Sequence, residues 1–292
     1  MRFTRQSSLS AEWWRNAAIA LAALGLLAAG TSCSSGPQPP QPGTPPFFWA
    51  AARETYRAGD YVKTSENLQR ILASENEFAA RARAWDMVIS SGLTQAYAEL
   101  ADTWENGARA NRPDPTPFRK QVSALRSLAS ASAIQSAEDL HKIVALDKDP
   151  NVLLAFAYPA GAAAQPAGLK RVGGGILVQE SERDLLQAAM MQRGVLLSVG
   201  RIVGSPDDAA AAQEKMKTGE ARVPRDAFLL AAANSLQEQS ELFAFNKLDQ
   251  PARLKMLAQE ALNALGAIPQ TKETKAVNDK VQARLKKARI TL

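Results

Sequence analysis

The chain has little of the side-chain chemistry on which most enzymes and metal sites depend. Among its 292 residues there is one cysteine, Cys33, and one histidine, His141. A single cysteine excludes a disulfide within the chain and a site built from several cysteine ligands. A single histidine excludes a zinc site built from histidines and leaves one candidate for a histidine general base. The stability of the fold must therefore come from an ordinary apolar core.

Motifs of the common nucleophilic and nucleotide-binding enzymes are also absent. No serine lies in a Gly-x-Ser-x-Gly context. The run Gly173-Gly174-Gly175 is not followed by the Lys-Ser or Lys-Thr of a phosphate-binding loop. We predict that the chain is not an enzyme and that it has no cofactor, no metal site and no catalytic residue.

One glutamate offers an alternative to that prediction. The pair Glu180-Ser181, with Met191-Gln192 further along the chain, resembles the catalytic Glu-Ser and later Met-Gln of lytic transglycosylases, which implies cleavage of the cell wall by Glu180. That chemistry needs a glutamate of raised pKa in an enclosed groove. The glycine and asparagine-tyrosine elements of that family's groove are missing. We therefore interpret Glu180 as an acidic residue that complements the dipole at the start of a helix.

Aromatic residues make up only 6% of the chain, and many of them gather in its first third. Such a cluster could form a groove for a peptide, a glycan or an apolar ligand. Packing in the core is the alternative, and it is favoured because most of these residues fall on apolar helix faces. The candidates for a binding surface are Trp49, Tyr56, Tyr61, Trp85, Tyr97 and Trp104.

The excess of positive over negative charge is also small. The net charge is +6 for the whole chain, and it falls to +4 when the first 32 residues are removed. This excess is too small to predict binding to nucleic acid. Basic residues are dense only over 272–289, where a predicted helix could bind an anionic partner or, as is more common, cap the fold with its charges in solvent.

Long apolar runs are absent except at the N-terminus. A run over 17–29 follows Arg2, Arg5 and Arg15, and it is too short to span a membrane comfortably. This order is typical of a secretory signal peptide, which we assign to 1–32. With small residues before it, Cys33 resembles the lipobox cysteine of bacterial lipoproteins, although that family prefers leucine at the position of Gly30.

The lipobox resemblance implies a location. The thiol of Cys33 would carry a diacylglycerol and anchor the chain to a membrane of the cell envelope. Ser34 takes the place of the aspartate that commonly retains such proteins in the inner membrane, so we expect the outer membrane, facing the periplasm. An ordinary cleaved signal with an incidental cysteine is the alternative.

The residues after Cys33 form a spacer. The segment 33–46 is rich in proline, which favours an extended conformation of about 3.1 Å per residue, so it could hold a domain roughly 30 to 40 Å from the membrane.

The remaining sequence is typical of an all-α protein. Alanine, leucine, glutamine, lysine, arginine and glutamate are common, and all favour helix. Apolar spacing predicts helices that end near 57, lie around 68–72, begin near 77, and cover 93–108, 118–130, 134–146, 180–203, 225–246, 251–265 and 272–289. We divide this part into a helical region over 47–150, an irregular insertion over 151–178 and a second helical region over 179–292. The insertion is rich in glycine, alanine and proline, and it could hold two short strands or a long loop.

The first predicted helix pair resembles a tetratricopeptide repeat. Phe48 opens the first helix and Gly59-Asp60-Tyr61 forms the turn, as in that family. Ile71-Leu72 stands where the family has Ala-Leu, Thr64 stands where it has a small residue, and its closing proline is absent. Ala261-Leu262 marks a second degenerate unit. The resemblance covers less than a quarter of the chain, and it implies helix pairs stacked as a solenoid with a concave binding surface. Unrelated helical hairpins are the alternative.

These observations favour a protein that acts by binding. We predict a lipid-anchored envelope protein that binds or scaffolds another envelope macromolecule. The alternative is a ligand-binding lipoprotein like those that accompany TRAP-type transporters, with a small hydrophobic ligand. Under either hypothesis the partners are a membrane and an envelope component, and not nucleic acid.

Overall fold

The computed structural model describes residues 40–112, 114–156, 171–172, 175–176, 180–245 and 247–290, without the side chains of 171–182. The predicted signal peptide, Cys33 and most of the spacer lie outside the described residues, as does the side chain of Glu180. The described part is mostly helical, with nine α-helices and a few short strands, which confirms the all-α class. None of these helices is both long enough and apolar enough to cross a membrane.

The first two helices form a hairpin. Helix α2 (Pro45–Arg57) and helix α3 (Tyr61–Ile71) pack against each other across the turn that the sequence predicts. Gly59 takes a positive φ of 77° in this turn, a conformation that glycine adopts at little cost. The side chain of Asp60 then caps α3 by accepting a hydrogen bond of 3.1 Å from the Lys63 amide.

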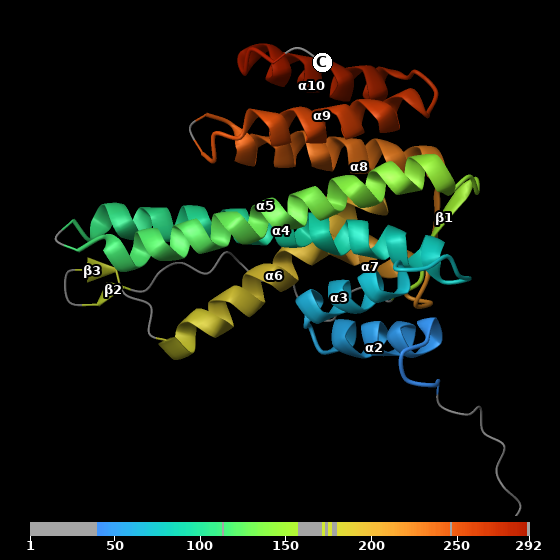
Figure 1. Ribbon diagram of the computed structural model, residues 1–292, viewed down its shortest axis with the longest axis horizontal. Coiled ribbons are helices and arrows are strands. Elements are labelled where there is room, and N and C mark those ends of the chain that lie inside the picture. The colour runs from blue at the N-terminus through green and yellow to red at the C-terminus, as the bar shows by residue number, and fades with distance from the viewer. Residues whose placement is uncertain are drawn as a thin grey trace, which may run out of the picture. The chain divides into compact units, whose positions relative to one another are not determined.

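Two long antiparallel helices form the spine of the molecule. They are α4 (Ala79–Ala110) and α5 (Thr116–Leu146), which Figure 1 shows running side by side along their full length. The sequence predicted four helices here, with breaks near 92 and 132, and both breaks were wrong. The small residues at those positions do not end a helix, because they face neighbouring helices and are mostly buried inside the fold.

Gly92 shows why a small residue occupies the middle of α4. Helix α6 (Glu180–Ile202) crosses α4 at this point, and a Cβ atom on Gly92 would lie 2.6 Å from the Cα of Val195. Gly194 of α6 makes the reciprocal approach, since its Cβ would lie 2.2 Å from the Gly92 carbonyl oxygen. Close by, the Ser198 hydroxyl donates a 2.7 Å hydrogen bond to the Val88 carbonyl oxygen. These glycines therefore allow two backbones to touch.

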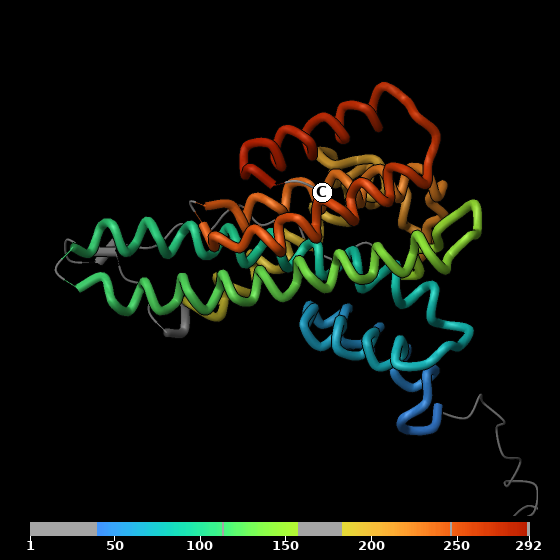
Figure 2. The backbone as a smooth tube through the Cα atoms, turned by 45° about the horizontal axis from the view of Figure 1, so that its top comes forward, coloured from blue at the N-terminus to red at the C-terminus, as the bar shows by residue number. Residues whose placement is uncertain are grey.

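The C-terminal helices are stacked on α5. After α7 (Ala209–Lys215) come α8 (Arg225–Gln239), a short 3₁₀ helix η1 (Ser240–Phe243), α9 (Pro251–Gly266) and α10 (Lys272–Lys287). Figures 1 and 2 show α8, α9 and α10 as successive layers. The predicted helix over 225–246 therefore ends at Gln239. Helix α10 buries Val277, Val281 and Leu285, so its apolar face is used inside the fold.

Short strands form two separate pairs, which Figure 1 shows at opposite ends of the molecule. Strand β1 (Asn151–Leu154) pairs antiparallel with β4 (Ala221–Pro224), and β2 (Arg171–Val172) pairs with β3 (Gly175–Ile176). The sequence predicted two strands or a loop within 151–178, and both β1 and the β2–β3 hairpin lie in that range. No pattern in the sequence indicated that β1 would pair with a strand from the second helical region.

The two predicted helical regions share one core. Trp85 and Met87 of the first region and Phe228 and Phe243 of the second are fully buried members of a single apolar cluster. Residues 40–292 form one compact unit. The choice between one body and two domains, which the sequence left open, is thus settled in favour of one.

Candidate functional site

The predicted aromatic surface lies mostly inside the protein. Trp85, Tyr61, Tyr97, Trp104 and Tyr56 are at most 5% exposed, and Trp49 is half-buried. Trp49, Tyr56 and Trp85 pack around the ring of Phe156, with Trp85 stacked on it at 4.6 Å between centroids, and Trp104 packs on Phe118. These side chains therefore belong to the core, which is the alternative that their position on apolar helix faces favoured.

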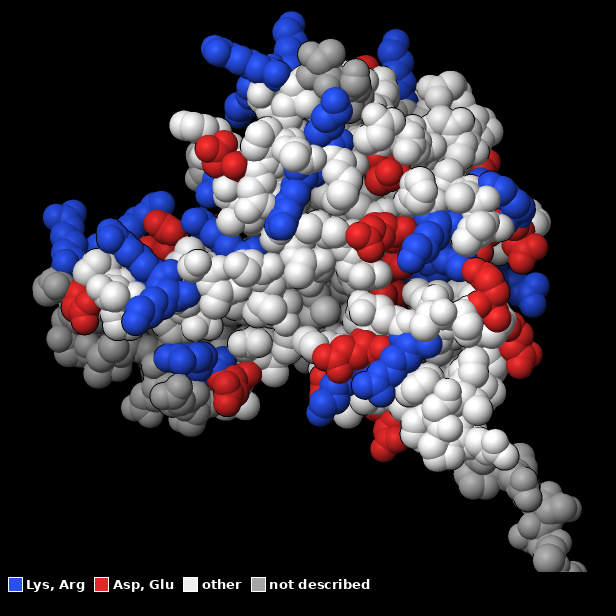
Figure 3. Space-filling model, in the orientation of Figure 1, with Lys and Arg blue, Asp and Glu red and all other residues white. Residues whose placement is uncertain are grey.

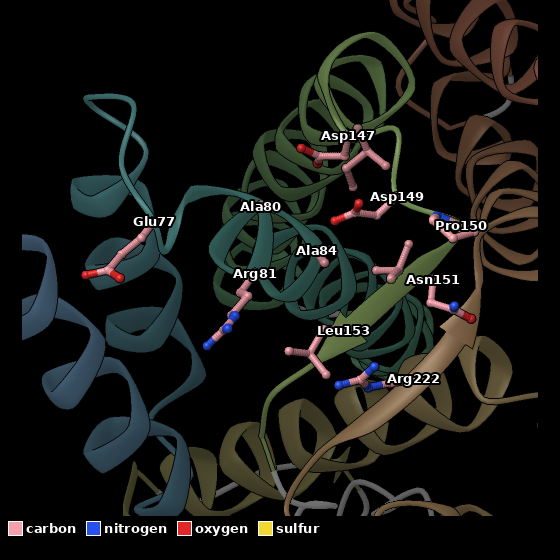
Figure 4. A pocket seen from close by; sticks show the side chains of 12 residues that line it. Glu77, Ala80, Arg81, Ala84, Asp147, Asp149, Pro150, Asn151, Leu153 and Arg222 are labelled. Carbon is pink, nitrogen blue, oxygen red and sulfur yellow. The ribbon is translucent and has the colours of Figure 1, made fainter.

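A surface cleft of about 490 Å³ lies between the start of α4, the end of α5 and strand β1. Figure 4 shows this cleft with β1 between α4 and β4, and with the side chains of Leu153 and Arg222 extending from the two strands toward α4. Its volume falls within the range of known ligand sites, about 300 to 1,000 Å³. The lining residues are Glu77, Ala80, Arg81, Ala84, Ile143, Asp147, Asp149, Pro150, Asn151, Val152, Leu153 and Arg222.

One edge of β1 is open beside this cleft. Among the described residues β1 pairs only with β4, so its opposite edge has no partner strand. The Arg225 amide donates to the Pro150 carbonyl oxygen, which makes Asn151 and Pro224 a pair without mutual hydrogen bonds. Because the pattern alternates, the amide and carbonyl groups of Asn151 and Leu153 point away from β4. None of these amide and carbonyl groups forms a hydrogen bond with another backbone group among the described residues.

The rim of the cleft carries charges of both signs. Glu77, Arg81, Asp149 and Arg222 form no ion pair with any described residue. Figure 3 shows acidic and basic side chains side by side over the end of the molecule where β1 lies. An occupant of the cleft would therefore meet two cations and two anions that are free to pair with it.

A buried arginine beneath the cleft joins the helices that form it. Arg83 is 4% exposed and donates a 2.7 Å hydrogen bond to Asp147, which fixes the end of α5 against the start of α4. Arg225 donates to the Asp147 carbonyl oxygen at 2.9 Å, which ties the start of α8 to the same point. The position of β1 is thus set by contacts on both sides.

This arrangement suits an extended polypeptide. A strand laid along the open edge of β1 would meet the free amide and carbonyl groups at the usual strand spacing of about 4.8 Å. Main-chain hydrogen bonds of this kind supply affinity, and the side pockets and rim charges supply specificity. The arrangement offers no nucleophile with an adjacent base.

A second polar cluster lies inside the fold, away from the cleft. Asp86 of α4 and Asp139 of α5 are both fully buried. The Ser65 hydroxyl of α3 donates a 2.5 Å hydrogen bond to Oδ1 of Asp86, and the Gln135 amide donates to Oδ2 of Asp139 at 3.2 Å. The two carboxyl groups also hydrogen-bond each other. We call this the acid pair.

Two oxygen atoms of the acid pair, Oδ2 of Asp86 and Oδ1 of Asp139, meet no ordinary donor. We infer that a proton shared between the two carboxyl groups satisfies them. Burial raises the pKa of Asp86 to about 6. Burial, together with the charge of Asp86, raises the pKa of Asp139 well above its usual value. Lys142 acts on both groups from a distance, and no described basic residue forms an ion pair with either.

Neither the β1 cleft nor the acid pair was predicted from the sequence. Asp86 lies in the run Trp85-Asp86-Met87-Val88-Ile89, and a lone carboxylate in an apolar run was a signal that could have identified it. The cleft offered no comparable signal, because its open edge depends on a pairing between strands far apart in the sequence.

The remaining candidate residues are dispersed. His141 is exposed and lies 3.0 Å from Glu260 of α9, and Glu180 is the first residue of α6. The described residues include no group of three or more metal-ligating His, Cys, Asp or Glu side chains.

Comparison with known proteins found no related protein. No protein-family model matches the chain, and no significant match exists among curated proteins or among solved structures.

Proposed function

We propose that this chain is a lipid-anchored, non-catalytic protein of the bacterial cell envelope that holds an extended segment of another envelope protein along β1. In this proposal Cys33 carries the anchor, residues 33–46 form the spacer, and the helical body faces the periplasm from the outer membrane. The membrane and the envelope protein are its partners.

The helical body would serve as a degenerate tetratricopeptide-like scaffold. The α2–α3 hairpin supports this for the first pair, because its turn is formed by the residues that carried the resemblance, with Gly59 at positive φ and Asp60 as the cap. The layered order of α8, α9 and α10 is compatible with stacked helix pairs.

The observation that carries the proposed binding role is the open edge of β1 beside the cleft of about 490 Å³. Exposed strand edges attract other strands, and proteins usually cover or shorten them. Here the edge is flanked by Arg81, Arg222, Glu77 and Asp149, none of which has an ionic partner among the described residues. A segment with both signs of charge would satisfy the backbone and the rim together.

Capture in cells tests this proposal. A photoreactive p-benzoylphenylalanine at position 80, which is exposed, uncharged and lines the cleft, should crosslink to one envelope protein, with position 120 on α5 as the control site. Mass spectrometry would then identify the partner segment. We expect a short stretch rich in β-forming residues.

Two substitutions at one position separate strand addition from simple contact. Leu153→Pro removes an amide that points away from β4, so it should abolish the crosslink without breaking the β1–β4 ladder. Leu153→Ala keeps that amide and should retain most of the crosslink. A crosslink that survives Leu153→Pro, or one equally strong from position 120, would overturn the proposal.

A further inference from the structure

A groove of about 230 Å³ lies between α3 and the α4–α5 hairpin, on a different part of the surface from the β1 cleft. Its rim carries Val62 and Leu128, which are 38% and 44% exposed and are two of the few large apolar side chains that the described surface presents. Its floor includes Ser65 and Gln135, which are the residues that bond to the acid pair. The groove is thus apolar at its mouth and polar at its base.

The floor of the groove presents acceptors. The hydroxyl proton of Ser65 is used by Asp86, and the Gln135 amide group donates to Asp139. The Gln69 amide group donates to the Ser65 oxygen at 3.3 Å. The side-chain carbonyl oxygens of Gln69 and Gln135 accept no hydrogen bond from any described residue and remain open to a donor.

The electrostatic character of the groove is negative. Glu66 is the only charged residue among those that line it, and it forms no ion pair with a described residue. Beneath Ser65 and Gln135 lies the acid pair, whose two carboxyl groups have no basic partner in contact. Lys142 acts on the pair only from a distance, so a buried negative charge with no ion pair favours the approach of a cation.

We propose that this groove binds a small organic cation, an amine whose ammonium group lies over Ser65 and Gln135 while its short apolar body packs between Val62 and Leu128. The ammonium group brings three donors to a floor of acceptors, and its charge complements Glu66 and the acid pair. This site is independent of the proposed binding along β1.

Photoaffinity labelling of the full chain tests the proposal. The probe is an alkyl diazirine with a primary amine, compared with the alcohol of the same shape, and hexylamine is the competitor. We expect the amine to label peptides from 61–71 and 126–136 about tenfold more than the alcohol, with labelling suppressed by hexylamine. Equal labelling by amine and alcohol, or labelling elsewhere, would overturn the proposal.

A charge placed at the rim provides the matched variant. Leu128→Lys brings a cation to the mouth of the groove and should abolish the labelling, whereas Leu146→Lys makes the same change at an exposed leucine near the other end of α5 and should not. Glu66→Gln removes the rim charge and should reduce labelling severalfold. Because all three positions are exposed, folding should be retained, and circular dichroism checks this. Labelling that persists in Leu128→Lys contradicts the assigned groove.

Discussion

At the scale of single residues, the acid pair is the least expected feature of this protein. Asp86 and Asp139 occupy positions at which an apolar residue would pack without a desolvation cost. Replacing a buried polar pair by apolar groups often leaves stability unchanged or improves it, so their presence is not explained by stability alone. Their shared proton makes the fold sensitive to pH.

We expect the free energy of unfolding to decrease as the pH rises from 4 to 8. The pKa of Asp86 rises from 3.8 in the unfolded chain to about 6 in the fold, so its stabilising contribution is complete below 3.8 and is lost as the pH passes through 6. A shift of this size corresponds to about 3 kcal/mol. Urea denaturation across this pH range measures it.

Asp139→Asn should reduce this dependence, because residue 139 no longer titrates while burial still raises the pKa of Asp86. The asparagine amide can donate to Asp86 permanently, so the pair no longer needs a proton. Glu138→Gln makes the same change of charge at the exposed neighbouring residue and serves as the control. A wild-type stability that does not vary between pH 4 and 8 would rule out the shared proton.

The contact between Gly92 and Gly194 gives a second prediction at this scale. Gly92→Ala places a methyl group 2.6 Å from the backbone of α6 and should destabilise the fold by about 2 kcal/mol or more. Gly266→Ala, at the end of α9 with no atom within 4 Å of the new methyl group, should be neutral or slightly stabilising. Thermal unfolding of both variants compares them, and similar losses would contradict the close approach.

At the scale of elements, the caps and turns were the most predictable part of the fold. Asp208 caps α7 by accepting a 2.9 Å hydrogen bond from the Ala211 amide, and aspartate is a preferred residue at that position. The helices over 45–57, 180–202, 251–266 and 272–287 also begin and end close to their predicted positions. Local chemistry determines these features, so a short stretch of sequence is enough to predict them.

The features that were not predicted, such as the continuity of α4 and the pairing of β1 with β4, depend on contacts between distant segments. Ser90-Ser91-Gly92 has the composition of a break, and only the approach of α6 shows why it is helical. The pairing of β1 with β4 joins Leu154 to Ala221, and four-residue strands carry too short a pattern to reveal their partner. The β1 cleft depends on that pairing. The groove between α3 and the α4–α5 hairpin depends on helices from distant segments, so neither site could be predicted from the sequence.

Helix α10 offers a prediction for a single element. Thr271 and Thr274 form a reciprocal capping box at its start, in which each side chain bonds to the other's amide. Thr271→Ala should destabilise this helix by about 1 kcal/mol and should speed hydrogen exchange in 272–287 more than in α4. Lys272→Ala, one residue later, lacks a capping role and is the control. Uniform loss of protection over both helices would contradict a local cap.

At the scale of the whole molecule, one core joins both predicted helical regions. Helix α4 packs against α5 of the first region and α6 of the second, so neither region can keep its apolar surface buried without the other. We therefore expect a single cooperative unfolding transition. Tryptophan fluorescence, which reports mainly on residues before 105, and hydrogen exchange in α9 should give the same midpoint, and two separate midpoints would contradict the shared core.

The proposed anchor gives the last prediction. Cys33→Ser removes the thiol that lipidation requires. In a detergent phase separation, the variant should therefore move from the detergent-rich phase to the aqueous phase. Ser34→Ala is the matched control and should leave the partition unchanged. A wild-type protein that already partitions into the aqueous phase would contradict lipidation.

The length of the spine has a mechanical consequence. Helix α4 begins beside the cleft at Ala80 and Arg81 and continues to Ala110, and at 1.5 Å per residue its 32 residues span about 48 Å. Its antiparallel partner α5 braces it against bending. The start of α4 beside the cleft and its far end at Ala110 are therefore held at a fixed separation by the α4–α5 hairpin.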